Sequence, residues 1–253
     1  MKRVLLVVAY DGTQYCGWQV QPHQATIEGE LNKALESLTG VPTEVIGASR
    51  TDSGVHAKCN LAVFDTESPI PGEKFFYAVN KYLPADIRVI ASREVPTDFH
   101  PRHMETKKTY EYRIQCAAVP DPMRRNYVCF TFRNMDVAAM QEGAAKLIGE
   151  HDFASFCSAG STAETTVRTL YQCDVRTHGD EIIIRVQGSG FLYNMVRIIA
   201  GTLMDVGVGL RSPEDVQRML DAADRSAAGP TAPPQGLTLV NYEIVSTGEI
   251  FGK

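Results

Sequence analysis

A loop that holds one arginine and one aspartate is the first place in the sequence where chemistry could occur. The run Ser49–Gly54, SRTDSG, lies between two strand-like segments and carries Arg50 close to Asp52. Loops at strand ends often hold catalytic residues, and an ionised carboxylate there can act as a nucleophile or stabilise developing charge. Ordinary turn chemistry also explains Thr-Asp-Ser-Gly, so both interpretations stay open at this point.

Two hydrolase interpretations use the same region and fit it poorly. A serine hydrolase with Ser49 or Ser53 as nucleophile and His56 as base would need a G-x-S-x-G elbow, and the sequence has none. Strand alternation also places these side chains on different faces. A metal-dependent hydrolase using His56, His100 and His103 lacks a recognised ligand spacing. We therefore expect no metal site.

Two further segments each place one polar side chain among apolar neighbours. In the run 109–116, TYEYRIQC, strand alternation turns Tyr110 toward an interior or a pocket. In FLYNMVRIIAGTL, Arg197 shares a narrow helix face with Asn194 and Gly201, and the small residue allows another backbone to come close. Because burial of an unpaired charge is costly, we expect Arg197 to have a carboxylate partner. A core tyrosine and a surface arginine are the alternatives.

The elements that position these residues follow from hydrophobic periodicity and capping signals. Strand-like runs precede and follow helical ones along the whole chain. Thr26 and Asp136 are suited to cap helices, and Ser212 followed by proline is a strong helix start. The pattern predicts helices over residues 27–38, 73–83, 137–148, 191–206 and 213–223, and a rigid loop over 227–236.

The chain reads as two related halves. The helix ending Leu38-Thr39-Gly40 has a counterpart ending Leu147-Ile148-Gly149, displaced by 109 residues, and both lie between strand-like runs. We predict an N-terminal α+β half over residues 1–104 with the aspartate loop, and a C-terminal half over 105–253 with the tyrosine strand and the arginine helix. Two ferredoxin-like halves would form an extended, mainly antiparallel sheet with helices on one face and a central cleft.

Composition narrows the possible classes of protein. The 253 residues are 44% hydrophobic and 22% charged, which is typical of a folded globular chain. The six cysteines form no C-x-x-C pair, so we expect reduced thiols in a cytoplasmic protein. No apolar run approaches the roughly 20 residues of a membrane span. The net charge of −5 conceals a basic stretch, residues 101–133, with seven basic and three acidic side chains.

Several blocks together resemble the tRNA pseudouridine synthase A family. They occur in the family's order and cover about residues 3 to 243. R-T-D-x-G-V-H-A combined with G-F-L-x-x-x-V-R is the most specific part. Departures from the family pattern occur at Ser49, Ser53, Pro101, His103 and Met104. The blocks are AYDGTQYCGWQ (9–19), SRTDSGVHAK (49–58), FHPR (99–102), KKTYEY (107–112), GSGFLYNMVRIIAGTL (188–203) and GPTAPPQGLTLV (229–240).

The resemblance implies a fold, a reaction and a set of site residues. It implies the pseudouridine synthase fold and isomerisation of uridine to pseudouridine at positions 38, 39 and 40 of the tRNA anticodon stem-loop, by a homodimer without metal or organic cofactor. Asp52 matches the catalytic aspartate, Tyr110 the tyrosine that stacks on the target base and is the candidate proton acceptor, and Arg197 the arginine paired with the aspartate. Arg50 matches the arginine associated with base displacement, and His56 is a further candidate substrate contact. The alternative is a non-catalytic RNA-binding protein on the same fold.

Overall fold

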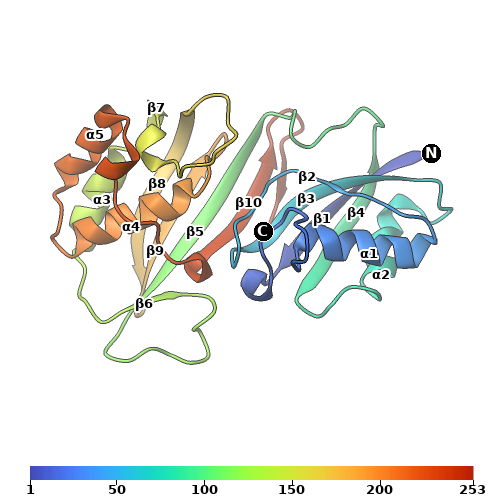
Figure 1. Cartoon of the computed structure of the whole chain (residues 1–253), viewed down its shortest axis with the longest axis horizontal. Helices are drawn as coiled ribbons and strands as arrows, with labels where there is room; N and C mark the ends of the chain where they lie inside the picture. The colour runs from blue at the N-terminus through green and yellow to red at the C-terminus, as the bar shows by residue number, and fades with distance from the viewer. Residues whose placement is uncertain (253) are drawn as a thin grey trace. The chain divides into compact units, whose positions relative to one another are not determined.

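The computed structural model describes residues 1–252, and the chain divides into two compact units. The first unit comprises Met1–Glu105 and the residues from Leu239 onward, and the second comprises Thr106–Thr238. The predicted division of the chain between residues 104 and 105 assigns the C-terminal strand to the second half. In the structure, the residues from Leu239 onward belong to the first unit. Both units mix helices with strands, so the predicted α+β class is confirmed (Figure 1). No helix among the described residues is long and apolar enough to span a bilayer.

The first unit contains a sheet in the order β4-β1-β3-β10. Strand β1 is antiparallel to both β3 and β4, β2 pairs with β3, and β11 pairs with β10. Two helices of this unit contact each other on the sheet. The elements are β1 Lys2–Tyr10, α1 Ile27–Thr39, β2 Ile46–Gly47, β3 His56–Thr66, α2 Phe75–Val79, β4 Ile87–Val95, β10 Leu237–Ile244 and β11 Glu249–Phe251, with short 3₁₀ turns at Gly12–Gln14 and Gly72–Lys74.

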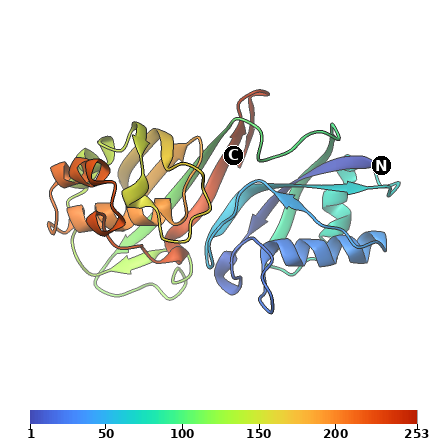
Figure 2. The same ribbon diagram turned by 45° about the horizontal axis from the view of Figure 1, so that its top comes forward.

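The second unit contains strands in the order β5-β9-β8-β7, all antiparallel. Strand β6 runs parallel to the end of β5. Helix α3 contacts both α4 and α5, and the three form one group (Figures 1 and 2). The elements are β5 Thr106–Cys116, β6 Cys129–Thr131, α3 Val137–Ala145, β7 Gly149–Asp152, β8 Val167–His178, β9 Glu181–Gly188, α4 Met195–Gly207 and α5 Pro213–Ala222, with 3₁₀ turns at Ala154–Phe156, Arg225–Ala227 and Pro234–Gly236.

Helix boundaries follow the capping signals where the chain supplies them. Thr26 accepts a hydrogen bond from Gly29 N–H at the start of α1, and Gly40 ends the helix in the left-handed region. Ser212 and Asp215 form a capping box at α5. Both helices are therefore confirmed to within one residue.

Three predicted helices are shorter than expected. The predicted helix 137–148 ends at Ala145 because the next turn tightens, with Leu147 N–H bonded to the Ala144 carbonyl. The predicted helix 73–83 is a 3₁₀ turn followed by α2 and further turns. Helix α4 begins at Met195 rather than 191 because Asn194 has a φ of 60°, which interrupts helical geometry.

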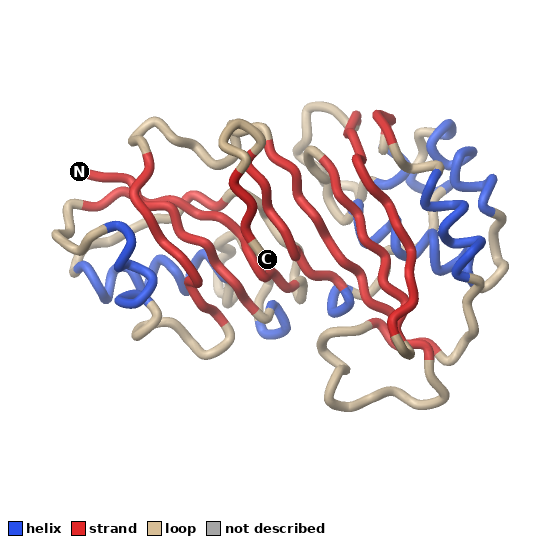
Figure 3. The backbone as a smooth tube through the Cα atoms, turned by 180° about the vertical axis from the view of Figure 1, so that it is seen from behind, coloured by secondary structure: helices blue, strands red, loops and turns tan. Residues whose placement is uncertain are grey.

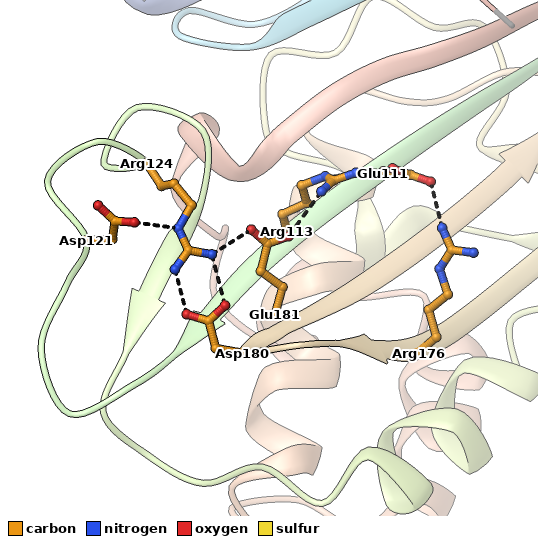
Figure 4. Close-up of polar contacts among 7 residues, drawn as sticks. All are labelled: Glu111, Arg113, Asp121, Arg124, Arg176, Asp180 and Glu181. Carbon is orange, nitrogen blue, oxygen red and sulfur yellow. Dashed lines mark hydrogen bonds and ion pairs between the residues drawn. The ribbon is translucent and has the colours of Figure 1, made fainter.

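One face of the second unit's strands carries a network of charged side chains instead of helices (Figures 3 and 4). The carboxylate of Glu111, 5% exposed, lies 3.0 to 3.2 Å from nitrogens of Arg113, Arg176 and Arg185 on three adjacent strands. Arg124, from the segment between β5 and β6, bonds to one acidic side chain of its own segment and to two at the β8–β9 hairpin. Its partners are Asp121, Asp180 and Glu181. The network fixes that segment against the sheet.

We predict that Gly201→Ala destabilises the protein, because a methyl group there would overlap the carbonyl oxygen of Pro230. Alanine in a helix gains about 1 kcal/mol over glycine, whereas overpacking a close backbone contact typically costs about 1–3 kcal/mol. The contact is with backbone, which cannot rotate away, so the cost should lie at the upper end of this range. We therefore expect a net loss of about 2 kcal/mol in the free energy of unfolding.

Urea unfolding measures this difference. Gly190→Ala is the matched control, since a methyl group there would meet Arg168 Nε at an ordinary 3.8 Å. Equal unfolding midpoints for the two variants would contradict the prediction.

Candidate functional site

The loop that carries Asp52, residues 48–55, is held by hydrogen bonds along its backbone. Trp18 N–H donates to the Thr51 carbonyl at 3.0 Å, and Gly54 N–H donates to the Tyr15 carbonyl at 3.2 Å. The carbonyl of Asp52 itself accepts from Val55 N–H. Bonds on both sides of the aspartate restrict its backbone, and its side chain is partly exposed. A fixed backbone presents the carboxylate in a defined direction.

Side chains of strands β1 and β3 form hydrogen bonds with the same loop. The hydroxyls of Tyr10 and Thr51 are 2.8 Å apart, and Asn60 Nδ2 donates to the Ser49 carbonyl at 2.8 Å. Tyr10 is buried, and burial raises the pKa of its phenol well above the ordinary value. The hydroxyl therefore stays protonated and available for hydrogen bonding.

Glycines allow the loop to lie directly on the segment that follows β1. Gly17 has a φ of 83°, and a side chain there would come within 2.5 Å of the Thr51 carbonyl oxygen. A side chain on Gly12 would overlap the Val55 backbone. These two positions belong to the block AYDGTQYCGWQ, and the contacts explain why glycine occurs there.

Arg50 on the loop and His56, the first residue of β3, flank the aspartate in sequence and have different surroundings. Arg50 is exposed. His56 is 4% exposed, and its Nδ1 lies 3.0 Å from Gly12 N, which donates to it, and 3.2 Å from Asp11 Oδ1. The arginine can reach a ligand in solvent, whereas the histidine fixes the backbone at the base of the loop.

Tyr110 lies on β5 of the second unit with its ring turned toward the helix-covered side. It is 7% exposed, and its ring meets Phe191 edge to face with centroids 5.2 Å apart. Phe191 belongs to the turn that precedes α4. The contact restricts the plane of the phenol ring.

Arg197 is oriented by bonds within the second unit. Its Nε donates to the Ala232 carbonyl and its Nη1 to Asn194 Oδ1, both at 2.8 Å. In return, Ala232 N–H donates to the Arg197 carbonyl at 3.0 Å. Asn194 is itself held by Ser158 Oγ at 2.9 Å. The predicted close approach of a second backbone to this helix face is present, and these contacts set the plane of the guanidinium.

The segment that receives Arg197, residues 229–236, is rigid for identifiable reasons. Gly229 N–H donates to Thr202 Oγ1 at 2.9 Å, and Tyr112 OH donates to the Pro233 carbonyl at 2.8 Å. Gly236 packs directly on the Tyr112 ring. The predicted rigid loop therefore serves as the support of the arginine.

The structure groups the sequence-predicted residues by unit. Arg50 and Asp52 lie on the loop of the first unit and His56 begins β3 directly after it. Tyr110 and Arg197 lie on β5 and α4 of the second unit, two elements that contact each other. Sequence reasoning missed the supporting residues. Their signal was present in the matching blocks, which include Gly12, Gly17, Trp18, Tyr112 and Ala232. Within residues 1–252 no three His, Cys, Asp or Glu side chains gather as metal ligands would.

Comparison with known proteins identifies the family. The family model described as tRNA pseudouridine synthase matches residues 6–103 and 144–243. A protein named tRNA pseudouridine synthase A from Halalkalibacterium halodurans is 46% identical over 238 residues, 94% of this chain and 90% of the relative. Another of that name, from Brevibacillus brevis, is 46% identical over 245 residues, 97% of this chain and 100% of the relative.

A third relative supports the same assignment. The protein named tRNA pseudouridine synthase A 2 from Clostridium perfringens is 46% identical over 239 residues, which are 94% of this chain and 98% of the relative. The ranges matched by the family model extend into both units and contain Arg50, Asp52, His56 and Arg197, whereas Tyr110 lies between them. The chain belongs to the tRNA pseudouridine synthase family, whose members are isomerases.

Proposed function

We propose that this protein converts uridine to pseudouridine at positions 38, 39 and 40 of the tRNA anticodon stem-loop. Family membership supports tRNA pseudouridylation. The observation that carries the proposal is the placement of Asp52. Its loop is hydrogen-bonded to neighbouring backbone on both sides of the aspartate, and the residue itself is partly exposed. The three positions follow from the resemblance of the motif blocks to the A family.

The chemistry suits a single carboxylate. The bond between uracil N1 and the ribose must break, the ring must turn, and C5 must join the ribose carbon. The C5 proton then leaves while N1 gains one, so the reaction is redox-neutral and needs no cofactor. We propose that Asp52 stabilises or captures the intermediate, and that Tyr110 stacks on the uracil and accepts the C5 proton.

Arg197 and Arg50 have distinct proposed roles. We propose that Arg197 pairs with Asp52 during the reaction, because a cation at short range keeps a carboxylate ionised and oriented. The target nucleotide must leave its stack at a cost of a few kcal/mol, roughly what stacking and phosphate contacts can offset. An exposed arginine beside the aspartate suits that step, so we assign it to Arg50. The buried contacts of His56 favour support of the loop over direct substrate contact.

We further propose a homodimer that acts on tRNA in the cytoplasm. The chain carries a net charge of −5, which is unfavourable for binding a polyanion. The basic stretch, residues 101–133, offsets this locally, and a second copy would bring a second stretch to the same RNA. Sedimentation of the protein with and without tRNA would measure the stoichiometry.

Asp52→Asn should abolish catalysis while tRNA binding persists, because the amide keeps the shape of the side chain and removes its charge. We expect release of tritium from carbon-5-labelled uridine in tRNA to fall by roughly a thousandfold or more. Asp221→Asn, an exposed carboxylate of α5, is the control and should leave release unchanged. Undiminished release by Asp52→Asn would remove the residue from its role, and tRNA binding without any release by the natural chain would favour a non-catalytic RNA-binding protein.

Arg197→Lys should lower turnover far more than tRNA affinity. Lysine keeps the charge but cannot donate to Ala232 and Asn194 in the planar arrangement of a guanidinium. We expect kcat to fall roughly a hundredfold with KM nearly unchanged, as for an interaction realised only in the transition state. Arg218→Lys on the exposed side of α5 is the matched control. Near-normal kcat in Arg197→Lys would show that guanidinium geometry is unnecessary.

Mapping of pseudouridines in bulk tRNA should place the product at positions 38, 39 and 40 and nowhere else. The reason is that the whole chain, including all motif blocks, matches the A family. Tritium release that maps to another arm of tRNA would keep the isomerase assignment and overturn the proposed positions.

A further inference from the structure

A turn in the first unit brings two imidazoles and a guanidinium together. His100 and His103 stack with ring centroids 4.0 Å apart and planes 20° from parallel. His103 N–H donates to the His100 carbonyl at 3.1 Å, which closes the turn. Arg102 lies between them in the sequence, and both Arg102 and His103 are exposed. Three side chains able to carry positive charge thus share one short turn.

The turn is tied to the base of the Asp52 loop. Arg102 Nε donates to the Gly47 carbonyl at 2.7 Å, and Gly47 is the last residue of β2, just before that loop. At the other end of the turn, Arg3 Nη1 donates to the Phe99 carbonyl at 2.9 Å. All of these residues belong to the first unit. A ligand held by Arg102 would therefore lie next to the segment that carries Arg50 and Asp52.

The two guanidinium groups near the imidazoles differ in whether a carboxylate pairs with them. Arg3 is neutralised by Asp65, which accepts from its Nε and Nη2 at 2.8 and 2.7 Å. Arg102 has no ion pair within residues 1–252. The groups that surround the imidazoles are Arg3 of β1 with its partner Asp65 of β3, and Asp98, Arg102 and His103 of the turn's own segment.

The surroundings of His100 disfavour a positive charge on its ring. Its Nδ1 accepts the Arg102 N–H at 3.3 Å, so the neutral ring carries its proton on Nε2. Partial burial, together with the charges of His103, Arg102 and Arg3, lowers the pKa of His100 below its ordinary value. A second positive charge beside Arg102 is therefore unfavourable until an anion binds.

We propose that His100, Arg102 and His103 form a binding site for a backbone phosphate of the tRNA, and that filling this site draws a proton onto the imidazole pair. The proposal rests on the proposed function, since that function supplies the RNA. A guanidinium fork suits phosphate oxygens, and phosphate contacts position RNA on a protein without reading its sequence. The site would hold the strand beside the target nucleotide.

The sign of the pH dependence follows from linkage. Bound phosphate raises the pKa of His100 from its lowered value, so binding takes up a proton and affinity rises as pH falls from 8 to 6. Arg3 stays cationic throughout this range, because its bond to Asp65 raises the pKa of its guanidinium. Asp65 stays ionised as well, because the guanidinium of Arg3 lowers the pKa of its carboxyl.

Fluorescence anisotropy with labelled, unmodified tRNA at fixed ionic strength tests the proposal. From pH 8 to 6 the natural chain should bind about tenfold more tightly, which corresponds to about one pKa unit. The double variant His100→Gln/His103→Gln should lose most of this gain. His178→Gln, at an exposed position of β8, is the control and should keep it. Arg102→Gln should weaken binding at both pH values and reduce the slope of log K against log salt by about one.

A second measurement avoids variants altogether. In proton–carbon spectra of the natural chain, which has six histidines, two imidazoles should titrate at higher pH when tRNA is present. A pH gain retained by the double variant, an unchanged salt slope in Arg102→Gln, or histidine titrations that tRNA does not shift would each overturn the proposal. Failure of the proposed function gives a different result, namely no pseudouridine from the natural chain at saturating tRNA.

Discussion

The backbone of the Asp52 loop lies directly on the segment that follows β1, and this close packing is the constraint on which the site depends. Gly12 and Gly17 leave no side chain between the two segments, and hydrogen bonds from Trp18 and to Tyr15 join them. A carboxylate on a freely moving loop would have to be ordered at each reaction cycle. Here that ordering is completed during folding, by contacts that only glycine permits.

In the second unit, close packing between a helix and a loop fixes the position of Arg197 in a similar way. Gly201 and Gly229 let α4 touch the segment 229–236, and Arg197 exchanges two hydrogen bonds with Ala232 across that contact. In both units backbone hydrogen bonds between neighbouring segments fix the backbone that carries a candidate side chain. Backbone carbonyls and amides stay fixed when neighbouring side chains change, so the geometry tolerates sequence variation around it.

Sequence reasoning reached the α+β class, the capped helices and the candidate residues because each left a local signal. Thr26 and Ser212 mark helix starts, and alternation around Tyr110 places it on the covered face. Several supporting residues lie in the motif blocks, but no local pattern identifies their partners. Nothing in the sequence pairs Tyr112 with Pro233 or Asn60 with Ser49, because these contacts join residues 121 and 11 positions apart through the tertiary fold. The left-handed φ of Asn194, which shortens α4, likewise follows from packing and not from helix propensity.

The charged face of the second unit limits how that surface can change over evolutionary time. Glu111 is shared by guanidinium groups from three neighbouring strands, those of Arg113 and Arg176 (Figure 4) and that of Arg185, so its loss would leave three cations near one buried position. Loss of one arginine leaves the carboxylate with two partners and is far milder. Descendants of this protein are therefore expected to lose peripheral arginines first and to replace the central glutamate only after several of them have gone.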